Sequence, residues 1–441
     1  MEIVALYLLL PLFVLLVLGV PIAISLGLSS AFFLYLMNIP ELELAARPIP
    51  IMTLVTEMFT GVNQFALLAL PMFVLSGELM NRFNIVDRLI DLARYSIGWV
   101  RGGMAHVTIA ASTMFAFISG SALATAASIG PIMIPAMIKE KYPNAFAAAL
   151  VAAAAMLGPI IPPSTPMIIV GSQLGISIGG MFAGGILPGL MISAVLMIMS
   201  YLIARRRNMG EVHKFEGVPA ITRSIFRALP AISVPALLLI GIIGGVFTPT
   251  EAGAVTVAYA LFLGTFYFRT AERSKILGAL WSTAKITASV LFIVACALVF
   301  NRIMTYFQVP QNLVKLMVSI SSDPVVLVII IIAFLLFVGT FMDELSNLII
   351  LGPLLMPVCT QVVGMHPIQY GLFLMVGILL GLLTPPLSLL LNVAAPIGRV
   401  SVGRVSVVVL PFFFAQVLIV AAIAFIPAIT LALPRLFGFV D

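Results

Sequence analysis

Long apolar stretches recur along the whole chain, separated by short polar segments. A helix that crosses a membrane needs about 20 predominantly apolar residues. Stretches near or above that length predict ten crossings, at residues 4–20, 22–37, 65–80, 145–172, 180–204, 228–247, 251–268, 284–306, 368–395 and 405–433. The first two are short and meet at Gly19-Val20-Pro21, so they could instead form one long, kinked helix.

Two further apolar stretches, residues 104–138 and 324–358, are interrupted in the middle by small or polar residues. The first interruption is Ser119-Gly120-Ser121, and the second runs from Met342 to Asn347. Each stretch could cross the membrane once. Alternatively, each could enter as a helix, turn at the interruption and return to the same side, which is a re-entrant hairpin.

The positions of Lys and Arg distinguish these arrangements, because basic residues collect in cytoplasmic loops. Residues 81–101 are rich in arginine, Lys139 and Lys141 follow the first interrupted stretch, and residues 205–227 form a basic loop. All three segments lie on the cytoplasmic side only if residues 104–138 turn back. We therefore predict a multi-pass protein of a bacterial inner membrane, with two hairpins and with both termini in the periplasm.

The composition excludes several other classes of protein. Of the 441 residues, 62% are apolar and 9% are charged, whereas soluble domains carry about 25% charged residues. The net charge of +6 comes from the basic loops, so we expect membrane lipid and no nucleic acid among the partners. The sequence has no phosphate-binding loop of the kind that hydrolyses ATP. No histidine within a predicted span lies beside an acid or serine at helical spacing, so we predict no enzyme.

The two halves of the chain carry the same features in the same order. Gly130–Pro135 aligns with Gly352–Pro357 at an offset of 222 residues, which is 352 minus 130. Gly158 aligns with Gly381 at an offset of 223, which is 381 minus 158. Chance agreement in a chain rich in Gly and Pro is the alternative. Because each half contains five predicted crossings, an odd number, the second half would enter the membrane from the opposite face.

The predicted fold is therefore an all-α integral membrane protein with an inverted-topology repeat, a common architecture of secondary transporters. Residues 1–204 form the first repeat and residues 228–434 the second, joined by a basic cytoplasmic linker at 205–227. Each repeat contains one re-entrant hairpin and one broken helix, at 104–138 and 145–172 in the first and at 324–358 and 368–395 in the second.

Prolines interrupt both predicted broken helices. Residues 158–166 and 383–388 cannot form continuous helix, because proline lacks an amide hydrogen and its ring clashes with the preceding turn. Carbonyl groups freed by such breaks can coordinate a cation, and helix N-termini attract anions. Each break is paired with a hairpin tip, so we predict two cation sites. The alternative is that the prolines merely kink packed helices.

The two predicted sites contain only oxygen ligands. Hydroxyls, carbonyls, an amide and a carboxylate supply them, from Ser119, Ser121, Thr125, Gly158, Ile161 and Pro163 in the first site and from Asp343, Ser346, Asn347, Thr384 and Pro386 in the second. Hard oxygen ligands without His or Cys favour Na⁺ over a transition metal. An acid such as Asp343 within an apolar stretch indicates function, although it could also be a hairpin-tip residue in water.

The candidate residues for an anionic substrate are Arg302, Ser164 and Thr165. Arg302 could face a cavity and meet a substrate carboxylate, or it could extend to the membrane interface. The amphipathic stretch 51–60 could lie along the membrane surface and meet another subunit.

Several motifs together resemble one family of transporter subunits. In chain order they are Leu70-Pro71-Met72-Phe73, Gly77-Glu78-Leu79-Met80, Ser119-Gly120-Ser121, the segment from Gly158 to Ser164, the segment from Phe247 to Ala252, and Phe341-Met342-Asp343 with Gly352-Pro353. Their order and spacing resemble the large membrane subunit of tripartite ATP-independent periplasmic (TRAP) transporters, from about residue 5 to residue 430.

The resemblance implies properties that the composition does not show. Such subunits belong to an ion-transporter superfamily in which two hairpins and two broken helices form a domain that moves, by an elevator motion, against a scaffold. The family couples uptake to a Na⁺ gradient. It requires a small four-helix membrane subunit and a periplasmic substrate-binding protein. That protein delivers an organic acid, often a C4-dicarboxylate or sialic acid.

Two functions remain open from the sequence. One is a Na⁺-coupled permease subunit for an organic acid that requires both partner proteins. The other is a stand-alone carrier or exchanger of anions or dicarboxylates from the same superfamily. The amphipathic stretch 51–60 favours the first function mildly, and activity of the chain alone in liposomes would favour the second.

Overall fold

The computed structural model describes residues 2–40, 48–83, 86–211, 215–321, 323–384 and 388–440. Every regular element within these ranges is a helix. Eight of the described helices are long and apolar enough to cross a membrane, and a ninth span results if the helices on either side of the break at 161–164 count as one. The all-α membrane fold predicted from the sequence is therefore confirmed.

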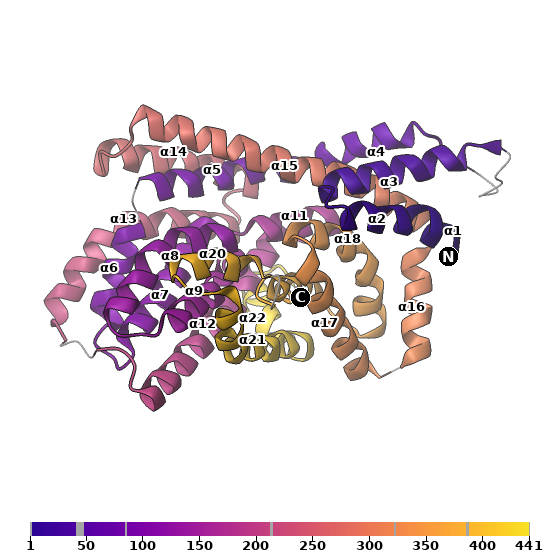
Figure 1. Ribbon diagram of the computed structural model, residues 1–441. Helices are drawn as coiled ribbons and strands as arrows, with labels where there is room; N and C mark the ends of the chain where they lie inside the picture. Colours follow the sequence, from indigo (N-terminus) through magenta and orange to yellow (C-terminus); the bar gives the residue numbers. More distant parts are fainter. Residues whose placement is uncertain are drawn as a thin grey trace.

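One layer of the molecule joins helices from distant parts of the chain (Figure 1). It consists of α3 (Ile22–Met37), α4 (Thr53–Val62), α5 (Ala69–Arg82), α14 (Pro249–Phe262) and α15 (Arg273–Tyr306). The long helix α15 packs against α3, α4 and α5, and α5 packs against α14. Short helical turns η3 (Phe65–Leu68) and η4 (Leu263–Tyr267) precede α5 and follow α14.

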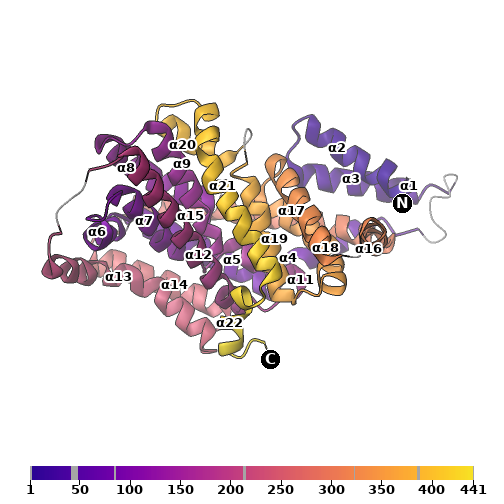
Figure 2. The ribbon, with the colours of Figure 1, turned by 90° about the horizontal axis from the view of Figure 1, so that it is seen from below.

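Most of the remaining helices form a second body beneath this layer (Figures 1 and 2). Its first half contains α7 (Gly103–Ser119), α8 (Ala122–Lys139), α9 (Asn144–Ala155), α10 (Leu157–Ile160), α11 (Thr165–Leu174) and α12 (Ile178–Arg207). Its second half contains α17 (Pro324–Phe341), α18 (Glu344–Pro357), η5 (Val358–Val362), α19 (Pro367–Gly381), α20 (Leu389–Ile397), α21 (Val402–Phe425) and α22 (Ala428–Leu436). Both interrupted stretches thus form helix–turn–helix units at the predicted positions, and their re-entry into a membrane remains a prediction.

Helix α9 lies at the centre of this second body. All residues from Phe146 to Ala155 are at most 2% exposed, and seven of these ten residues are alanine. Because alanine projects only a methyl group, neighbouring backbones can approach closely along the whole helix. Helices α7 and α8 from the first half and α20 and α21 from the second half all pack against α9. The two halves therefore share one core.

The first two predicted spans form separate helices rather than one kinked helix. The N-terminal helix, made of α1 (Glu2–Val4), η1 (Ala5–Leu9) and α2 (Leu10–Val17), packs against α3. Between α2 and α3, Gly19 has a φ of +78°, a left-handed conformation that favours glycine. Pro21 is extended and directly precedes α3. This turn reverses the chain.

The structure differs from the prediction at the linker 205–227 and near the C-terminus. Helix α12 continues to Arg207, and α13 (Val218–Ile243) begins well before residue 228. Three arginines lie in the last turn of α12, where positive charge interacts favourably with the helix dipole.

The predicted span 405–433 is divided, because α21 ends at Phe425 and α22 starts after Pro427. Two further helices, α6 (Val86–Ile97) and α16 (Val309–Ile320), lie outside the predicted spans.

Candidate functional site

The tip of the first helix–turn–helix unit is held by hydroxyl groups. Helix α7 ends at Ser119, Gly120 is left-handed with φ +59°, and Ser121 caps α8 by accepting a hydrogen bond from the amide of Ala124. The hydroxyls of Ser119 and Thr125 lie 2.7 Å apart, and the Thr125 hydroxyl donates to the Ser121 carbonyl at 2.8 Å. The sequence-predicted residues Ser119, Ser121 and Thr125 are therefore in direct contact.

The first helix break lies directly against this tip. A Cβ atom on Gly158 would come within 2.4 Å of the Ser121 carbonyl oxygen and 2.6 Å of Thr125 Oγ1. A Cβ on Gly120 would come within 2.8 Å of the Pro163 carbonyl oxygen. Only glycine permits these approaches. Gly158 and Pro163 thus join the tip residues, as the sequence predicted.

A serine cap defines the end of the first break. Between α10 and α11 the chain bends by 42°. Ser164 accepts a hydrogen bond from the amide of Met167 and donates one to the Pro159 carbonyl at 2.5 Å. Thr165 is the first residue of α11, so both candidate substrate residues lie at a helix N-terminus. Ile161, extended at the end of α10, is buried and packs close to Gly189 of α12.

The tip of the second unit follows the same plan with a carboxylate. Asp343 caps α18, because its carboxylate accepts hydrogen bonds from the Ser346 amide at 3.0 Å and the Ser346 hydroxyl at 2.6 Å. The side-chain amide of Asn347 donates to the Met342 carbonyl at 3.3 Å. Ser346 and Asn347 are fully buried. Asp343, Ser346 and Asn347 therefore form one cluster.

Two buried oxygen atoms at the second tip have no hydrogen-bond partner among the described residues. They are Asn347 Oδ1 and Glu344 Oε2. A buried acceptor without a partner carries a cost of about 1–3 kcal/mol, and a bound cation would remove that cost. The donor set is carboxylate, amide and hydroxyl oxygen, which suits Na⁺. Within the described ranges, no group of three or more His, Cys, Asp and Glu side chains is arranged for metal binding.

The second helix break lies beside this tip. The glycines of α17 and α19 meet, since a Cβ on Gly381 would lie 2.3 Å from the Gly339 carbonyl carbon. A cavity of about 220 Å³ lies here and is lined by both glycines together with Met342 and Asp343. Thr384 directs its hydroxyl to the Leu380 carbonyl within its own helical turn, at 2.9 Å. The predicted ligand Pro386 lies outside the described residues.

Sequence reasoning missed the serine that ends the second break. Ser388 caps α20, accepting from the Leu391 amide at 3.1 Å and donating to the Leu382 carbonyl at 2.5 Å. Ser164 makes the same pair of bonds in the first half. Ser388 lies 224 positions after Ser164, one more than the aligned offset of 223. Because of this extra residue, the alignment pairs Ser164 with Leu387 and hides the equivalence.

Arg302 pairs with an acid on a neighbouring helix. Its guanidinium lies 3.5 Å from the carboxylate of Glu57 on α4. The neighbouring residue, Asn301, donates its side-chain amide to the Ile349 carbonyl of α18 at 3.0 Å. Glu57 lies in the amphipathic helix that the sequence predicted at 51–60. In this structure Arg302 therefore serves an ion pair within the upper layer, and its proposed contact with substrate stays a prediction.

Known proteins match this chain over nearly its whole length. Residues 9–429 match the family described as tripartite ATP-independent periplasmic transporter, DctM component. The sialic acid TRAP transporter large permease protein of Vibrio cholerae is 37% identical, covering 95% of this chain and 96% of that protein. The C4-dicarboxylate TRAP transporter large permease protein of Pseudomonas aeruginosa is 34% identical, covering 94% of each chain.

Two solved structures share the fold. The YdaH transporter of Alcanivorax borkumensis has a TM-score of 0.60 at 14% identity, covering 88% of each chain. MtrF of Neisseria gonorrhoeae has a TM-score of 0.63 at 12% identity, covering 91% of this chain and 93% of that one. At these identities the likeness concerns the fold alone, and it is the fold of membrane transporters. With the family match over nearly its full length, this multi-pass chain belongs to the DctM family, the large permease subunits of TRAP transporters.

Proposed function

We propose that this permease subunit is a Na⁺-coupled symporter that imports an organic acid across the bacterial inner membrane. The observation that carries the proposal is the pair of tip-and-break clusters, each built from oxygen ligands at the N-terminus of a helix. The second cluster holds Asp343 and two buried oxygens that have no hydrogen-bond partner among the described residues. Coupled ions in secondary transporters bind at such broken helices.

The named relatives support an organic acid as the substrate. Their names specify sialic acid, C4-dicarboxylates, 2,3-diketo-L-gulonate and isethionate. The first three carry a carboxylate and isethionate carries a sulfonate, so all are organic anions. In this chain Ser164 and Thr165 lie at the N-terminus of α11, which is the positive end of a helix dipole. Such a terminus attracts a carboxylate. Arg302 would serve as a further cation if its pair with Glu57 opened.

The proposed transport cycle requires two partner proteins. The periplasmic substrate-binding protein delivers the acid, and the small four-helix membrane subunit completes the permease. The hairpins and broken helices would move together, by an elevator motion, against the layer of α3, α4, α5, α14 and α15. Both termini would lie in the periplasm. A stand-alone carrier of dicarboxylates or other anions is the competing function.

Uptake by the reconstituted complex tests this proposal. Proteoliposomes would receive an inward Na⁺ or K⁺ gradient, with radiolabelled sialic acid or succinate, with and without both partners. The key variant is Asp343→Asn, which removes the charge but leaves an oxygen acceptor that can cap α18. The matched control is Asp323→Asn, because Asp323 caps α17 in the same way, at 2.8 Å to the Val325 amide, but is exposed.

We expect uptake to require Na⁺ and both partners, to fall at least about tenfold in Asp343→Asn, and to persist in Asp323→Asn. Exchange that proceeds without partners and without Na⁺, and that tolerates Asp343→Asn, would favour the stand-alone carrier. Uptake that needs the partners but not Na⁺ would remove the ion coupling from the proposal and leave the subunit assignment intact.

A further inference from the structure

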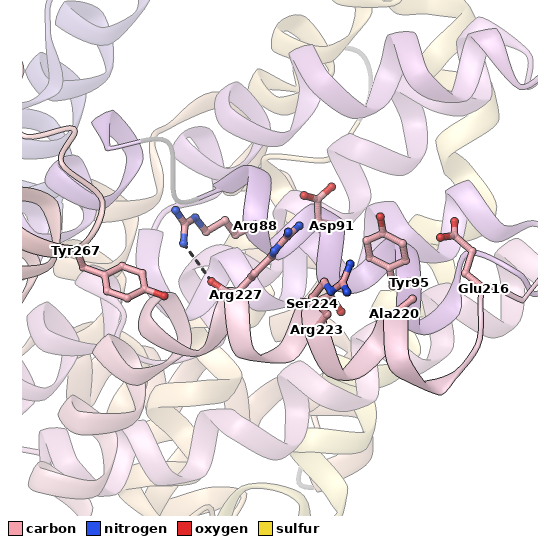
Figure 3. A pocket seen from close by; sticks show the side chains of 9 residues that line it. All are labelled: Arg88, Asp91, Tyr95, Glu216, Ala220, Arg223, Ser224, Arg227 and Tyr267. Atoms are coloured by element: carbon pink, nitrogen blue, oxygen red, sulfur yellow. Dashed lines mark hydrogen bonds between the residues drawn. The ribbon is translucent and has the colours of Figure 1, made fainter.

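A cavity of about 630 Å³ lies apart from both tip clusters, between α6, the start of α13 and the turn η4 (Figure 3). Its walls carry three arginines, Arg88, Arg223 and Arg227, together with the carboxylates of Asp91 and Glu216. Tyr95, Ser224 and Tyr267 add hydroxyl groups. Neither the predicted ion sites nor the predicted substrate residues include any of these side chains.

One of the three arginines is held firmly in place. The guanidinium of Arg88 donates a hydrogen bond to the Arg227 carbonyl at 3.3 Å, which is the dashed line in Figure 3. It also lies over the ring of Phe268, 4.2 Å from the centroid. Such stacking fixes the plane of a guanidinium without neutralising its charge. Arg88 therefore presents its remaining N–H groups in a fixed orientation.

The positive charge in this cavity lacks close compensation. Across the described part of the chain, no carboxylate lies within 4.0 Å of the side-chain nitrogens of Arg88, Arg223 or Arg227. Other basic side chains do have such partners, as in the pairs Arg82–Glu78, Lys141–Glu211, Lys275–Glu272 and Arg302–Glu57. Three arginines against two acids leave one positive charge in the cavity. An anion with a single negative charge matches it.

The surroundings of the cavity are apolar and exposed. Phe226 and Leu229 follow Arg223 on α13 and are 66% and 51% exposed, and Phe266, next to Tyr267, is 67% exposed. Large apolar side chains at the surface of a membrane protein meet acyl chains. A free phosphate ion would use the arginines but not this apolar border. A ligand with a charged head and apolar chains would use both.

We propose that this cavity binds the headgroup of an anionic glycerophospholipid, with phosphatidylglycerol as the best-matched type. The phosphate diester would accept hydrogen bonds from the arginines. The glycerol hydroxyls would donate to Asp91 and Glu216, and the acyl chains would lie over Phe226 and Leu229. Basic residues near the cytoplasmic end of spans commonly recognise lipid phosphates. The basic segments 81–101 and 205–227, which the sequence places in the cytoplasm, form this cavity.

The position of the cavity gives the lipid a structural role. Helix α6 directly precedes α7 of the first helix–turn–helix unit, and α13 directly precedes α14 of the upper layer. Helices α6 and α13 pack against each other, and α6 packs against α7. A headgroup that contacts both α6 and α13 would link the helix that leads into the first helix–turn–helix unit with the helix that leads into the upper layer (Figure 2).

Native mass spectrometry of the purified complex measures this binding directly. The protein would be titrated with phosphatidylglycerol, phosphatidylethanolamine of the same acyl chains, or inorganic phosphate. The variants are Arg223→Gln and the double variant Arg223→Gln/Arg227→Gln. Arg223 is exposed and has no intramolecular bond among the described residues, so its replacement leaves the fold intact. The matched control is Arg205→Gln/Arg206→Gln, at the exposed end of α12 outside the cavity.

We expect one tightly bound phosphatidylglycerol per chain. The double variant should weaken binding by about thirtyfold, since each near-surface arginine contributes about one factor of five. Arg223→Gln should weaken it by about fivefold, and the control should leave it unchanged. Equal binding of phosphatidylethanolamine, equal loss in the control, or unchanged binding in Arg223→Gln would overturn the proposal. Displacement of the lipid by millimolar inorganic phosphate would reassign the cavity to the free ion.

Discussion

The tips of the two helix–turn–helix units share a backbone plan and differ in charge. In both, a helix ends, one or two extended or left-handed residues follow, and a capped helix begins. The first tip uses neutral hydroxyls that satisfy one another, with Ser119 and Thr125 at 2.7 Å. The second tip uses a carboxylate, Asp343, and leaves Asn347 Oδ1 without a hydrogen-bond partner among the described residues. A repeated backbone therefore supports two sites with different electrostatics.

This difference predicts different roles for an ion at each tip. A cation at the first tip would be attracted only by dipoles of hydroxyl and carbonyl groups, whereas at the second it would neutralise a full charge. We infer that the second site binds more tightly and fills first. The following experiments test the comparison, beginning with the largest expected effect.

The first experiment prevents the close contact between the helix break and the first tip, which only glycine at position 158 allows. In Gly158→Ala the new Cβ would lie 2.4 Å from the Ser121 carbonyl oxygen. The tip and the break would have to separate, which costs about 1–3 kcal/mol of stability and should abolish Na⁺-driven uptake. The control is Gly403→Ala, because a Cβ there meets nothing within 4 Å. Thermal unfolding and uptake in proteoliposomes provide the measurements. Full uptake by Gly158→Ala would show that the tip and break need not touch.

The second experiment tests the neutral tip alone. Thr125→Val keeps the side-chain shape but removes the hydroxyl that donates to the Ser121 carbonyl at 2.8 Å. We expect the Na⁺ concentration for half-maximal uptake to rise by about five- to tenfold, since one buried hydrogen-bonding group contributes about 1 kcal/mol. Thr222→Val is the control, as Thr222 is exposed and bonds only the Val218 carbonyl of its own helix. An effect larger than that of Asp343→Asn would reverse the proposed order of the two sites.

The third experiment has the smallest expected effect and concerns the far end of the first unit. After α8, the ammonium of Lys141 lies 2.8 Å from the carboxylate of Glu211, which follows α12. The hydrogen bond and the charge of Glu211 raise the pKa of Lys141 above its usual 10.5. A raised pKa contributes stability that is present below the unfolded pKa and lost as pH rises through the folded one. The pair should therefore hold at neutral pH and weaken only above pH 10.5.

Because Lys141 is exposed, we expect Lys141→Gln to shift the thermal midpoint only slightly at pH 7 and not at all in high salt. Differential scanning fluorimetry at low and high ionic strength measures this shift. A large, salt-independent destabilisation would mean that Lys141 contributes through packing rather than through charge.

Local chemistry explains which parts of the fold the sequence could predict. The turns at Ser119-Gly120-Ser121 and Met342-Asp343 were located, because glycine and capping residues mark a helix boundary in any context. The second interruption was predicted to extend to Asn347, whereas α18 already begins at Glu344. Asp343, Ser346 and Asn347 fall within one turn of helix, so their contact follows from sequence spacing alone. Ser121 and Thr125 likewise lie four positions apart at the start of α8, and the short turn at Gly120 brings Ser119 to them.

Features that depend on distant contacts could not be predicted in this way. The partner of Arg302 is Glu57, 245 positions away in the sequence, and neither residue carries a local mark of that pairing. The linker 205–227 was expected to be a loop because of its charge, yet its ends extend α12 and α13. Ser388 was not recognised as the counterpart of Ser164, because one extra residue in the second half shifts it out of the alignment. Each of these outcomes depends on tertiary packing, which overrides local preference.

The alanine-rich surface of α9 bears on the number of ions that would be transported with each solute molecule. Helices from both halves of the chain rest on it, and α18, which begins at the second tip, packs against α11 and α19. The two tip clusters are therefore joined through packed helices. If these helices move together between the membrane faces, an ion at the first tip and an ion at the second must travel in the same step. The ratio of ions to solute would then be a whole number fixed by the architecture, and slippage would require α9 to lose its neighbours.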